Sequence, residues 1–228
     1  MKTIDRSFTD PLLGLTDGSE SRRWLFLGDS ITQGAEHTYG QRDYTQLFQE
    51  RVRYEMGRPK DLVLNAAVSG ATVSACLADL ERILAGYLPD VAFVMLGTND
   101  ASEDRAIAPE DFARDLGAVV NRLRKAGSQV ILQTPNPIIL ESAAPYAARF
   151  APVLAKIRAV AEEDEVALVD HEEHWNSYFS ANPKAFAPYF MCDGIHPNAL
   201  GHRLLANGLF QALDICDPMS QTCRLFIP

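Results

Sequence analysis

Short apolar segments alternate along the chain with segments whose apolar residues recur at helical spacing. Five of the apolar segments end at turn-forming residues, which is typical of buried strands. They are residues 24–27, 62–64, 91–96, 130–132 and 166–169. Helical spacing marks residues 43–56, 73–86, 112–123, 146–163 and the stretch that Pro197 opens.

This alternation predicts an α/β fold of three layers, in which helices cover both faces of a doubly wound, five-stranded parallel sheet. The third strand, residues 91–96, is apolar on both faces, as strands of covered parallel sheets are. Five strands connected in this way suit the flavodoxin-like strand order 2-1-3-4-5. We expect one domain over residues 1–228, with residues 1–22 as an N-terminal arm and residues 213–228 as a C-terminal tail.

The stretch before the last helix is rich in aromatic residues. We expect residues 171–192 to form a long loop, and Pro197 to occupy the first position of the helix, where its missing N–H costs nothing. The loop's aromatic side chains either complete the core or form a pocket wall, and the sequence leaves both open. They are Trp175, Tyr178, Phe179, Phe186, Tyr189 and Phe190. The proline-rich residues 135–140 are a second candidate wall.

Composition excludes several classes of function. With 47% hydrophobic and 22% charged residues, the chain has the balance of a globular protein. Its net charge of −9 disfavours nucleic acid and anionic membrane surfaces as partners. No segment approaches the ~20 apolar residues of a membrane helix. The first residues, MKTIDR, are followed by no apolar core, so we expect no secretory signal and a cytoplasmic location.

The cysteines give no sign of a metal or a cofactor. The four thiols form no CxxC pair and have no histidine at ligand spacing, so we expect no zinc site. Cys216 and Cys223 could form a disulfide in an oxidising compartment, but free thiols are the favoured interpretation. We expect Cys192 to be a small buried filler.

Polar residues suited to catalysis follow the predicted strands. The segments are Gly28-Asp29-Ser30-Ile31-Thr32, Ser69-Gly70, Gly97-Thr98-Asn99-Asp100 and, before the last helix, Asp193-Gly194-Ile195-His196-Pro197-Asn198. Ligands of open parallel sheets bind beyond the carboxyl ends of the strands, so we expect these segments to meet at one edge.

Together these residues can carry out acyl transfer. Ser30 is the candidate nucleophile and His196 the base that activates it. Asp193 lies three positions before His196, close enough to orient the ring and stabilise the imidazolium. The backbone N–H groups of Ser30 and Gly70 and the side-chain amide of Asn99 are the candidate donors to the oxyanion.

The four segments resemble, in order, the four motif blocks of the SGNH hydrolases, the GDSL-like esterases and lipases. The resemblance covers about residues 24–212. It implies a metal-independent ester hydrolase without a cofactor, with Ser30, Asp193 and His196 as the triad and Ser30, Gly70 and Asn99 as the oxyanion hole. The G-x-S-x-G elbow of the α/β-hydrolases is absent, which disfavours that different fold.

We therefore expect a serine esterase for small carboxylic esters, with an acetylated saccharide as the leading substrate. A lysophospholipase or thioesterase of the same family is the enzymatic alternative. A carbohydrate-binding homologue that has lost turnover is the alternative from another class. A flavodoxin-like nucleotide-binding switch is disfavoured, because the chain has neither a GxGxxG nor a Walker loop.

The other histidines are expected to be structural. His202 falls in the last helix, where it packs or faces solvent. His37, in the loop after the Ser30 turn, is expected at the surface, with a place in the pocket lining as the alternative. His171 and His174 are expected in a solvated loop, because their spacing is not that of the H-E-x-x-H zinc motif.

Overall fold

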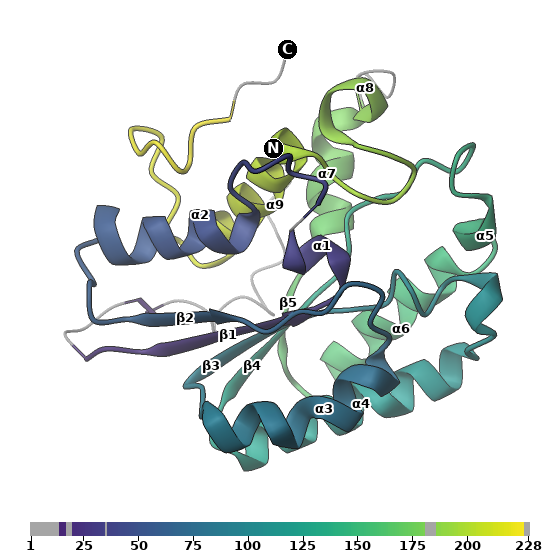
Figure 1. Ribbon diagram of the computed structural model, residues 1–228, viewed down its shortest axis with the longest axis horizontal. Coiled ribbons are helices and arrows are strands. Elements are labelled where there is room, and N and C mark those ends of the chain that lie inside the picture. The colour runs from purple at the N-terminus through teal and green to yellow at the C-terminus, as the bar shows by residue number, and fades with distance from the viewer. Residues whose placement is uncertain (1–13, 17–19, 35, 181–185, 226–228) are drawn as a thin grey trace.

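Five parallel strands form one sheet at the centre of the computed structural model, which describes residues 14–16, 20–34, 36–180 and 186–225 (Figure 1). The strands are β1 (Arg23–Gly28), β2 (Leu62–Asn65), β3 (Val91–Met95), β4 (Gln129–Gln133) and β5 (Ala167–Val169). They lie in the order β2-β1-β3-β4-β5, and each neighbouring pair is parallel. The predicted fold class and strand order are confirmed.

Helices cover both faces of the sheet (Figure 1). One face carries α2 (Tyr44–Glu50), α7 (His171–Phe179) and α9 (Ala199–Ala212); the other carries α3 (Val73–Gly86), α4 (Pro109–Lys125) and α6 (Phe150–Glu163). The shorter elements are α1 (Ser30–Gln33), α5 (Ala144–Ala147), α8 (Phe186–Phe190), a π-helical turn at Arg51–Glu55 and a 3-10 turn at Glu103–Arg105.

The alternating side chains of β1 build two separate cores. Trp24 and Phe26 point to the α2 side, where Phe26 stacks on Phe93 of β3 with ring centroids 4.6 Å apart. Leu25 and Leu27 point to the other side and pack among residues of α3, α4 and α6. Because β1 is buried on both faces, the loop that follows it has a rigid support.

The long aromatic loop expected over residues 171–192 is wrong, because α7 and α8 lie within it. Asp170 caps α7 by accepting a hydrogen bond from the backbone N–H of Glu173 at 3.0 Å. The helix buries His171, Trp175 and Phe179, which are four positions apart and share one face. A histidine occupies one of the core positions, so the apolar residues alone did not reveal the helical period.

Three predicted helix boundaries also need correction. The helix expected over 146–163 begins at Phe150, after the separate short α5. The helix expected over 43–56 changes to π-helical hydrogen bonding at Arg51. Pro197 does not open the last helix: Asn198 is its N-cap, accepting from the backbone N–H groups of Leu200 and Gly201.

The residues after α9 pack back onto the domain rather than leaving it. The carbonyl of Ile215 accepts a hydrogen bond from Arg51 Nε at 2.9 Å. The Glu55 carboxylate accepts hydrogen bonds from the side chains of Ser220 and Thr222. Among the described residues, none of the helices is both long and apolar enough to cross a membrane.

Candidate active site

The turn after β1 presents Ser30 at the start of α1. Asp29, almost fully buried, is the N-cap of α1 and accepts a hydrogen bond from the backbone N–H of Ile31 at 3.0 Å. A Cβ on Gly28 would lie 2.3 Å from Thr32 Oγ1 and 2.8 Å from the carbonyl oxygen of Met95. Only glycine therefore lets the chain turn tightly enough to place Ser30 at the sheet edge.

The segment before α9 folds Asp193 and His196 against each other. Asp193 Oδ1 accepts hydrogen bonds from the backbone N–H groups of Ile195 and His196, both at 2.8 Å. Its other oxygen, Oδ2, lies 2.8 Å from His196 Nδ1. Burial alone would raise the pKa of the Asp193 carboxyl, but these hydrogen bonds outweigh it and hold that pKa below its ordinary value.

The contact that completes the site joins two segments that are far apart in the sequence. Ser30 Oγ lies 2.8 Å from His196 Nε2, across 166 positions of sequence. Since Nδ1–H donates its hydrogen bond to Asp193, His196 Nε2 is left to accept the hydrogen bond from the Ser30 hydroxyl. Ser30, His196 and Asp193 thus form one continuous chain of hydrogen bonds, the arrangement that nucleophilic acyl transfer requires.

The loop after β4 supports this segment from behind. The backbone N–H of Ile139 donates to the carbonyl of Gly194 at 2.8 Å, and Asn136 Nδ2 donates to the carbonyl of Ile195 at 3.3 Å. The stretch at 135–140, the second candidate for a pocket wall, therefore holds the Asp193–His196 turn in place. Leu140 lies at the exposed end of this loop and is 57% exposed.

The two remaining oxyanion candidates lie on neighbouring turns. Gly70 follows β2 with a φ of +77°, in the left-handed region that favours glycine. Asn99 follows β3, and its Nδ2 donates to the carbonyl of Ala71 at 3.0 Å. That bond brings the Asn99 amide next to Gly70, which is the juxtaposition expected from the sequence.

Two buried carboxyls lie beneath these turns. Burial raises the pKa of Asp29 to about 7 and that of Asp100 to about 6, and the nearby Asp100 carboxyl also raises the pKa of Asp29. Asp100 Oδ1 accepts a hydrogen bond from the backbone N–H of Val73 at 3.0 Å. Asp100 thereby ties the turn after β3 to the start of α3, close to Gly70.

His37 is the residue that sequence reasoning missed. It was expected at the surface, but its side chain is only 21% exposed and its ring stacks on that of His196. The ring centroids are 3.6 Å apart and the planes differ by 6°. No signal in the sequence relates two histidines that are 159 positions apart.

His37, Asp193 and His196 each offer one metal-ligand atom, and these atoms lie within 4.8 Å of one another. The ring geometry does not fit a bound ion, however. The lone pair of an imidazole nitrogen lies in the ring plane, so two parallel stacked rings direct their lone pairs side by side instead of toward one point. The arrangement suits ring stacking rather than coordination.

The other expected positions divide between core and rim. Trp175, Phe179 and Phe190 are buried in the core, whereas Tyr189 is 46% exposed. Tyr178 is partly buried and donates to Asn207 Oδ1 at 3.3 Å, and the side chain of Phe186 lies outside the described residues. The aromatic set is therefore mainly core.

The histidines of α7 and α9 are buried or partly buried. His171 and His202 are almost fully enclosed, and burial lowers the pKa of each to about 3. His174 is partly buried, and burial lowers its pKa to about 4. The solvated loop expected around His171 and His174 is thus wrong, while His202 packs in the core.

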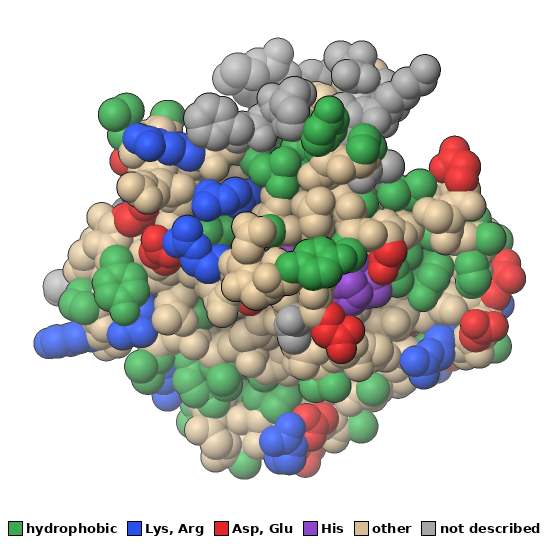
Figure 2. Space-filling view, turned by 45° about the horizontal axis from the view of Figure 1, so that its top comes forward, with side chains coloured by type: hydrophobic (Ala, Val, Ile, Leu, Met, Phe, Trp, Pro, Cys, Tyr) green, Lys and Arg blue, Asp and Glu red, His purple; other side chains and the backbone are tan. Residues whose placement is uncertain are grey.

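An exposed aromatic residue lies at the mouth of the site. Tyr39 is 78% exposed, and its hydroxyl lies 3.2 Å from Cys192 Sγ, next to Asp193. Figure 2 shows histidine side chains reaching the surface between hydrophobic and acidic side chains on this face. Cys192 is partly exposed rather than buried, and all four cysteines are free thiols.

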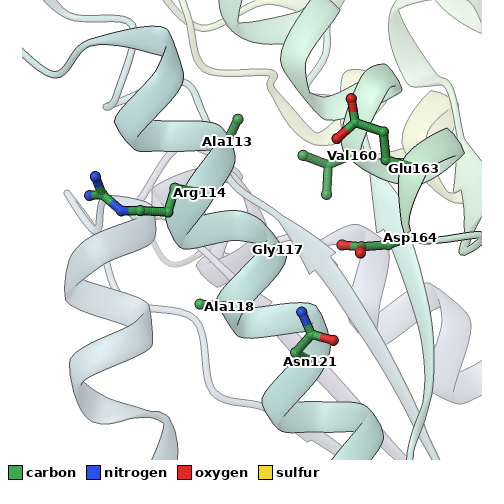
Figure 3. A pocket seen from close by; sticks show the side chains of 8 residues that line it. All are labelled: Ala113, Arg114, Gly117, Ala118, Asn121, Val160, Glu163 and Asp164. Atoms are coloured by element: carbon green, nitrogen blue, oxygen red, sulfur yellow. The ribbon is translucent and has the colours of Figure 1, made fainter.

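Two surface cavities lie away from this site. One, of about 380 Å³, lies between α4 and α6 and is lined by Gly117, Asn121, Glu163 and Asp164 among others (Figure 3). The other, of about 420 Å³, lies along α2 and includes Arg42 and Tyr54. Neither is lined by a residue of the predicted site. The site is therefore identified by the contacts among its catalytic side chains and not by a cavity.

Comparison with known proteins identifies the family of the chain. The model of the GDSL-like Lipase/Acylhydrolase family matches residues 26–204. Esterase TesA of Pseudomonas aeruginosa is 28% identical over 200 residues, which are 86% of this chain and 90% of TesA. The crystal structure of LAE5, a hydrolase from the metagenome of Lake Arreo, Spain, has a TM-score of 0.72 at 25% identity, covering 87% of this chain and 99% of LAE5. Axe2, an acetylxylan esterase of Geobacillus stearothermophilus, shares the fold with a TM-score of 0.70 at 22% identity, covering 89% of this chain and 96% of Axe2.

Proposed function

We propose that this chain, which belongs to the GDSL-like lipase/acylhydrolase family and is a carboxylic ester hydrolase, works as a serine esterase through Ser30, His196 and Asp193. One observation carries the proposal. The Ser30 hydroxyl, the His196 ring and the Asp193 carboxylate are joined by two contacts of 2.8 Å each. A nucleophile, its base and the group that orients the base are thus within reach of one another.

In the first half of the reaction, Ser30 Oγ attacks the ester carbonyl while its proton passes to His196 Nε2. Asp193 stabilises the imidazolium that forms. The backbone N–H groups of Ser30 and Gly70 and the Asn99 amide donate to the oxyanion. His196 then gives the proton to the leaving alcohol, which departs and leaves the acyl group on Ser30.

In the second half, a water molecule replaces the alcohol. His196 takes a proton from the water, and the resulting hydroxide attacks the acyl carbon. The second tetrahedral intermediate collapses to free acid, and His196 returns the proton to Ser30. The cycle needs no metal and no cofactor, in keeping with what the resemblance implies.

A short acyl group on a saccharide is the proposed substrate. The support is the exposed ring of Tyr39 beside the Asp193 turn, because aromatic faces suit the apolar faces of sugars. The fold is also shared with an acetylxylan esterase, a likeness that concerns architecture alone. An alcohol resting on Tyr39 would lie on the His196 side of the ester, where its oxygen must receive the proton.

A lysophospholipase or thioesterase is the second candidate, and one observation favours it. Val68, two positions before Gly70, is 54% exposed, and Leu140, at the end of the loop that supports Gly194, is 57% exposed. These two apolar side chains come from turns on different sides of the site. A long acyl chain could lie along such side chains and remove apolar surface from water.

Hydrolysis of p-nitrophenyl esters from acetate to palmitate tests both candidates. The wild type is compared with Ser30→Ala and with Ser177→Ala, a matched serine on the exposed surface of α7. We expect the wild type and Ser177→Ala to cleave acetate fastest and Ser30→Ala to fall by roughly 10⁴-fold or more. A maximum at long chains would favour the second candidate, and equal activity of Ser30→Ala would refute the serine mechanism.

A carbohydrate-binding homologue without turnover is the remaining alternative. A fluorophosphonate probe distinguishes it, because a working triad forms a covalent bond at Ser30. We expect labelling of the wild type and none of Ser30→Ala. Binding of acetylated xylo-oligosaccharides without labelling and without hydrolysis would establish the idle homologue instead.

A further inference from the structure

We propose that His37 is a positioning residue for His196, the base of this reaction. Its ring packs against the face of the His196 ring and keeps that ring in place while the hydrogen-bond partners of His196 change. The inference rests on the proposed serine-esterase function. The two imidazole planes are nearly parallel and 3.6 Å apart at their centroids. That is full contact between the faces of two rings, and it leaves the edge of His196 free for chemistry.

The need for such a contact follows from the steps of the reaction. In the free enzyme, Asp193 and Ser30 hold opposite edges of the His196 ring at 2.8 Å each. Once Ser30 Oγ is bonded to the acyl carbon, it has no proton to donate to Nε2. Asp193 is then the only member of the triad that still orients the ring. The contact with His37 involves the face of the ring, so acylation does not remove it.

His37 is itself held in place from both sides. Its neighbour Thr38 is buried and donates from Oγ1 to the carbonyl of Gly34 at 2.9 Å, at the end of α1. Tyr39 contacts Cys192 Sγ at 3.2 Å, beside the triad turn. The segment that carries His37 is therefore tied both to the nucleophile's helix and to the turn that carries the base.

The charges around His37 keep its ring neutral. Burial, followed by the neighbouring His196, lowers the pKa of His37, although Asp193 and Glu36 act in the opposite direction. From α9, the buried His202 also faces the pair and would repel added charge. The distance from His37 Nε2 to Asp193 Oδ2 is 3.8 Å, too long for a hydrogen bond, so Asp193 remains the partner of His196.

A neutral ring in this place has a second consequence. When His196 becomes an imidazolium, its positive charge lies over the π face of His37, and such a contact is attractive. If His37 were protonated, the same contact would be repulsive. The activity therefore requires both His37 and His196 to be unprotonated before the proton transfer.

Three variants test the proposal on p-nitrophenyl acetate. His37→Ala removes the ring, His37→Phe keeps a flat ring without charge, and Gln41→Ala is a control at an exposed position of the same loop. We expect kcat of His37→Ala to fall by roughly 10- to 100-fold with little change in KM, since a base misplaced by about 1 Å costs rate rather than affinity. His37→Phe should stay within about 3-fold of the wild type, as should Gln41→Ala.

The pH profile of kcat/KM supplies a readout that a merely structural role would not move. At acid pH the wild type should show a loss of activity that comes from protonation of His37, whose pKa is lowered, because a charged His37 repels the imidazolium. His37→Phe should lack this loss, because a phenylalanine ring cannot take up a proton. Thermal melts of all three variants show whether each is folded, and His37→Phe keeps the test valid if His37→Ala does not fold.

Three results would overturn the proposal. They are an unchanged kcat in His37→Ala, an equal loss in His37→Ala and His37→Phe, and an equal loss in Gln41→Ala. Failure of the proposed function looks different, because then the wild type itself cleaves no ester and is not labelled at Ser30. An active wild type with an indifferent His37 refutes only the positioning role.

Discussion

The side-chain amide of Asn99 carries two N–H groups, and one of them donates to the carbonyl of Ala71 at 3.0 Å. That bond fixes the plane of the amide. The second N–H lies in the same plane, so its orientation is already fixed when charge develops on the substrate. Preorganised donors of this kind stabilise an oxyanion more than water can, because they need not reorient.

We therefore expect Asn99→Ala to lower kcat by roughly 10²- to 10³-fold, the usual cost of losing one oxyanion donor. KM should change little, since the amide acts on charge that is absent from the bound ester. Steady-state kinetics on p-nitrophenyl acetate measure both. Asn176→Ala, on the exposed side of α7, is the matched control. A loss of less than about threefold would show that Asn99 does not contact the oxyanion.

A functional residue can be predicted from the sequence when a local pattern, such as the end of a strand or a shared turn, places it near its partners. Ser30, Gly70 and Asn99 each follow a predicted strand, and Asp193 and His196 share one turn, so their meeting could be predicted from parallel-sheet topology. His37 lies in a loop with no regular pattern. Its contact with His196 depends on the turn around Thr38, and no spacing rule describes such a turn.

Among the elements, α9 begins shortly after the turn that carries the base. Asn198 accepts hydrogen bonds from the N–H groups of Leu200 and Gly201, and its Nδ2 donates to the carbonyl of Tyr189 at 3.0 Å. One side chain thus caps the helix and fixes the chain on both sides of the Asp193–His196 turn. Its distance from His196 in sequence is only two residues.

We expect Asn198→Ala to reduce the free energy of unfolding by about 1 kcal/mol, the typical cost of a lost N-cap. We also expect kcat to fall, because the turn that carries the base loses an anchor. Urea unfolding measures the first effect and ester hydrolysis the second. Asn198→Asp keeps the acceptor that caps the helix and should recover most of the stability. Unchanged stability in Asn198→Ala would show that the cap is dispensable.

The elements that could be predicted are those whose core positions are apolar. The strands and α3 are correct because Val, Ile, Leu and Phe define their periods. α7 could not be recognised, because its buried face includes His171, whose Nε2 lies 2.9 Å from Gln133 Oε1 of β4. A polar side chain that is satisfied by a distant strand looks, in the sequence, like a solvated one.

At the scale of the whole molecule, two sets of buried ionisable groups pull stability in opposite directions. His171, His174 and His202 have pKa values lowered to about 3, 4 and 3, so near pH 5 the unfolded chain binds up to three protons that the native one excludes. Asp29 and Asp100 have pKa values raised to about 7 and 6, so near pH 5 the native chain holds two protons at these carboxyls that the unfolded chain has lost.

The smaller shifts of His37, lowered, and Asp43, raised, oppose each other in the same way. Carboxyls with lowered pKa values, such as Asp170 and Asp193, add little at pH 5, because a carboxyl of ordinary pKa is already mostly ionised there. The unfolded state then binds about one more proton than the native state near pH 5, from three histidines against two carboxyls. Stability should therefore rise with pH by only about 1.4 kcal/mol per pH unit in this range, the value for one proton.

Single substitutions should change this balance by one proton each. In His171→Gln, the unfolded chain has one fewer proton to gain, so the slope of stability against pH near pH 5 should fall toward zero. In Asp29→Asn, the native chain has one fewer proton to hold, so the slope should roughly double to about 3 kcal/mol per pH unit. Urea unfolding between pH 4.5 and 5.5 measures these slopes, with Glu163→Gln on the exposed end of α6 as the control. Equal slopes in all four proteins would mean that these groups titrate alike in the folded and unfolded chains, and that their burial does not set the pH dependence.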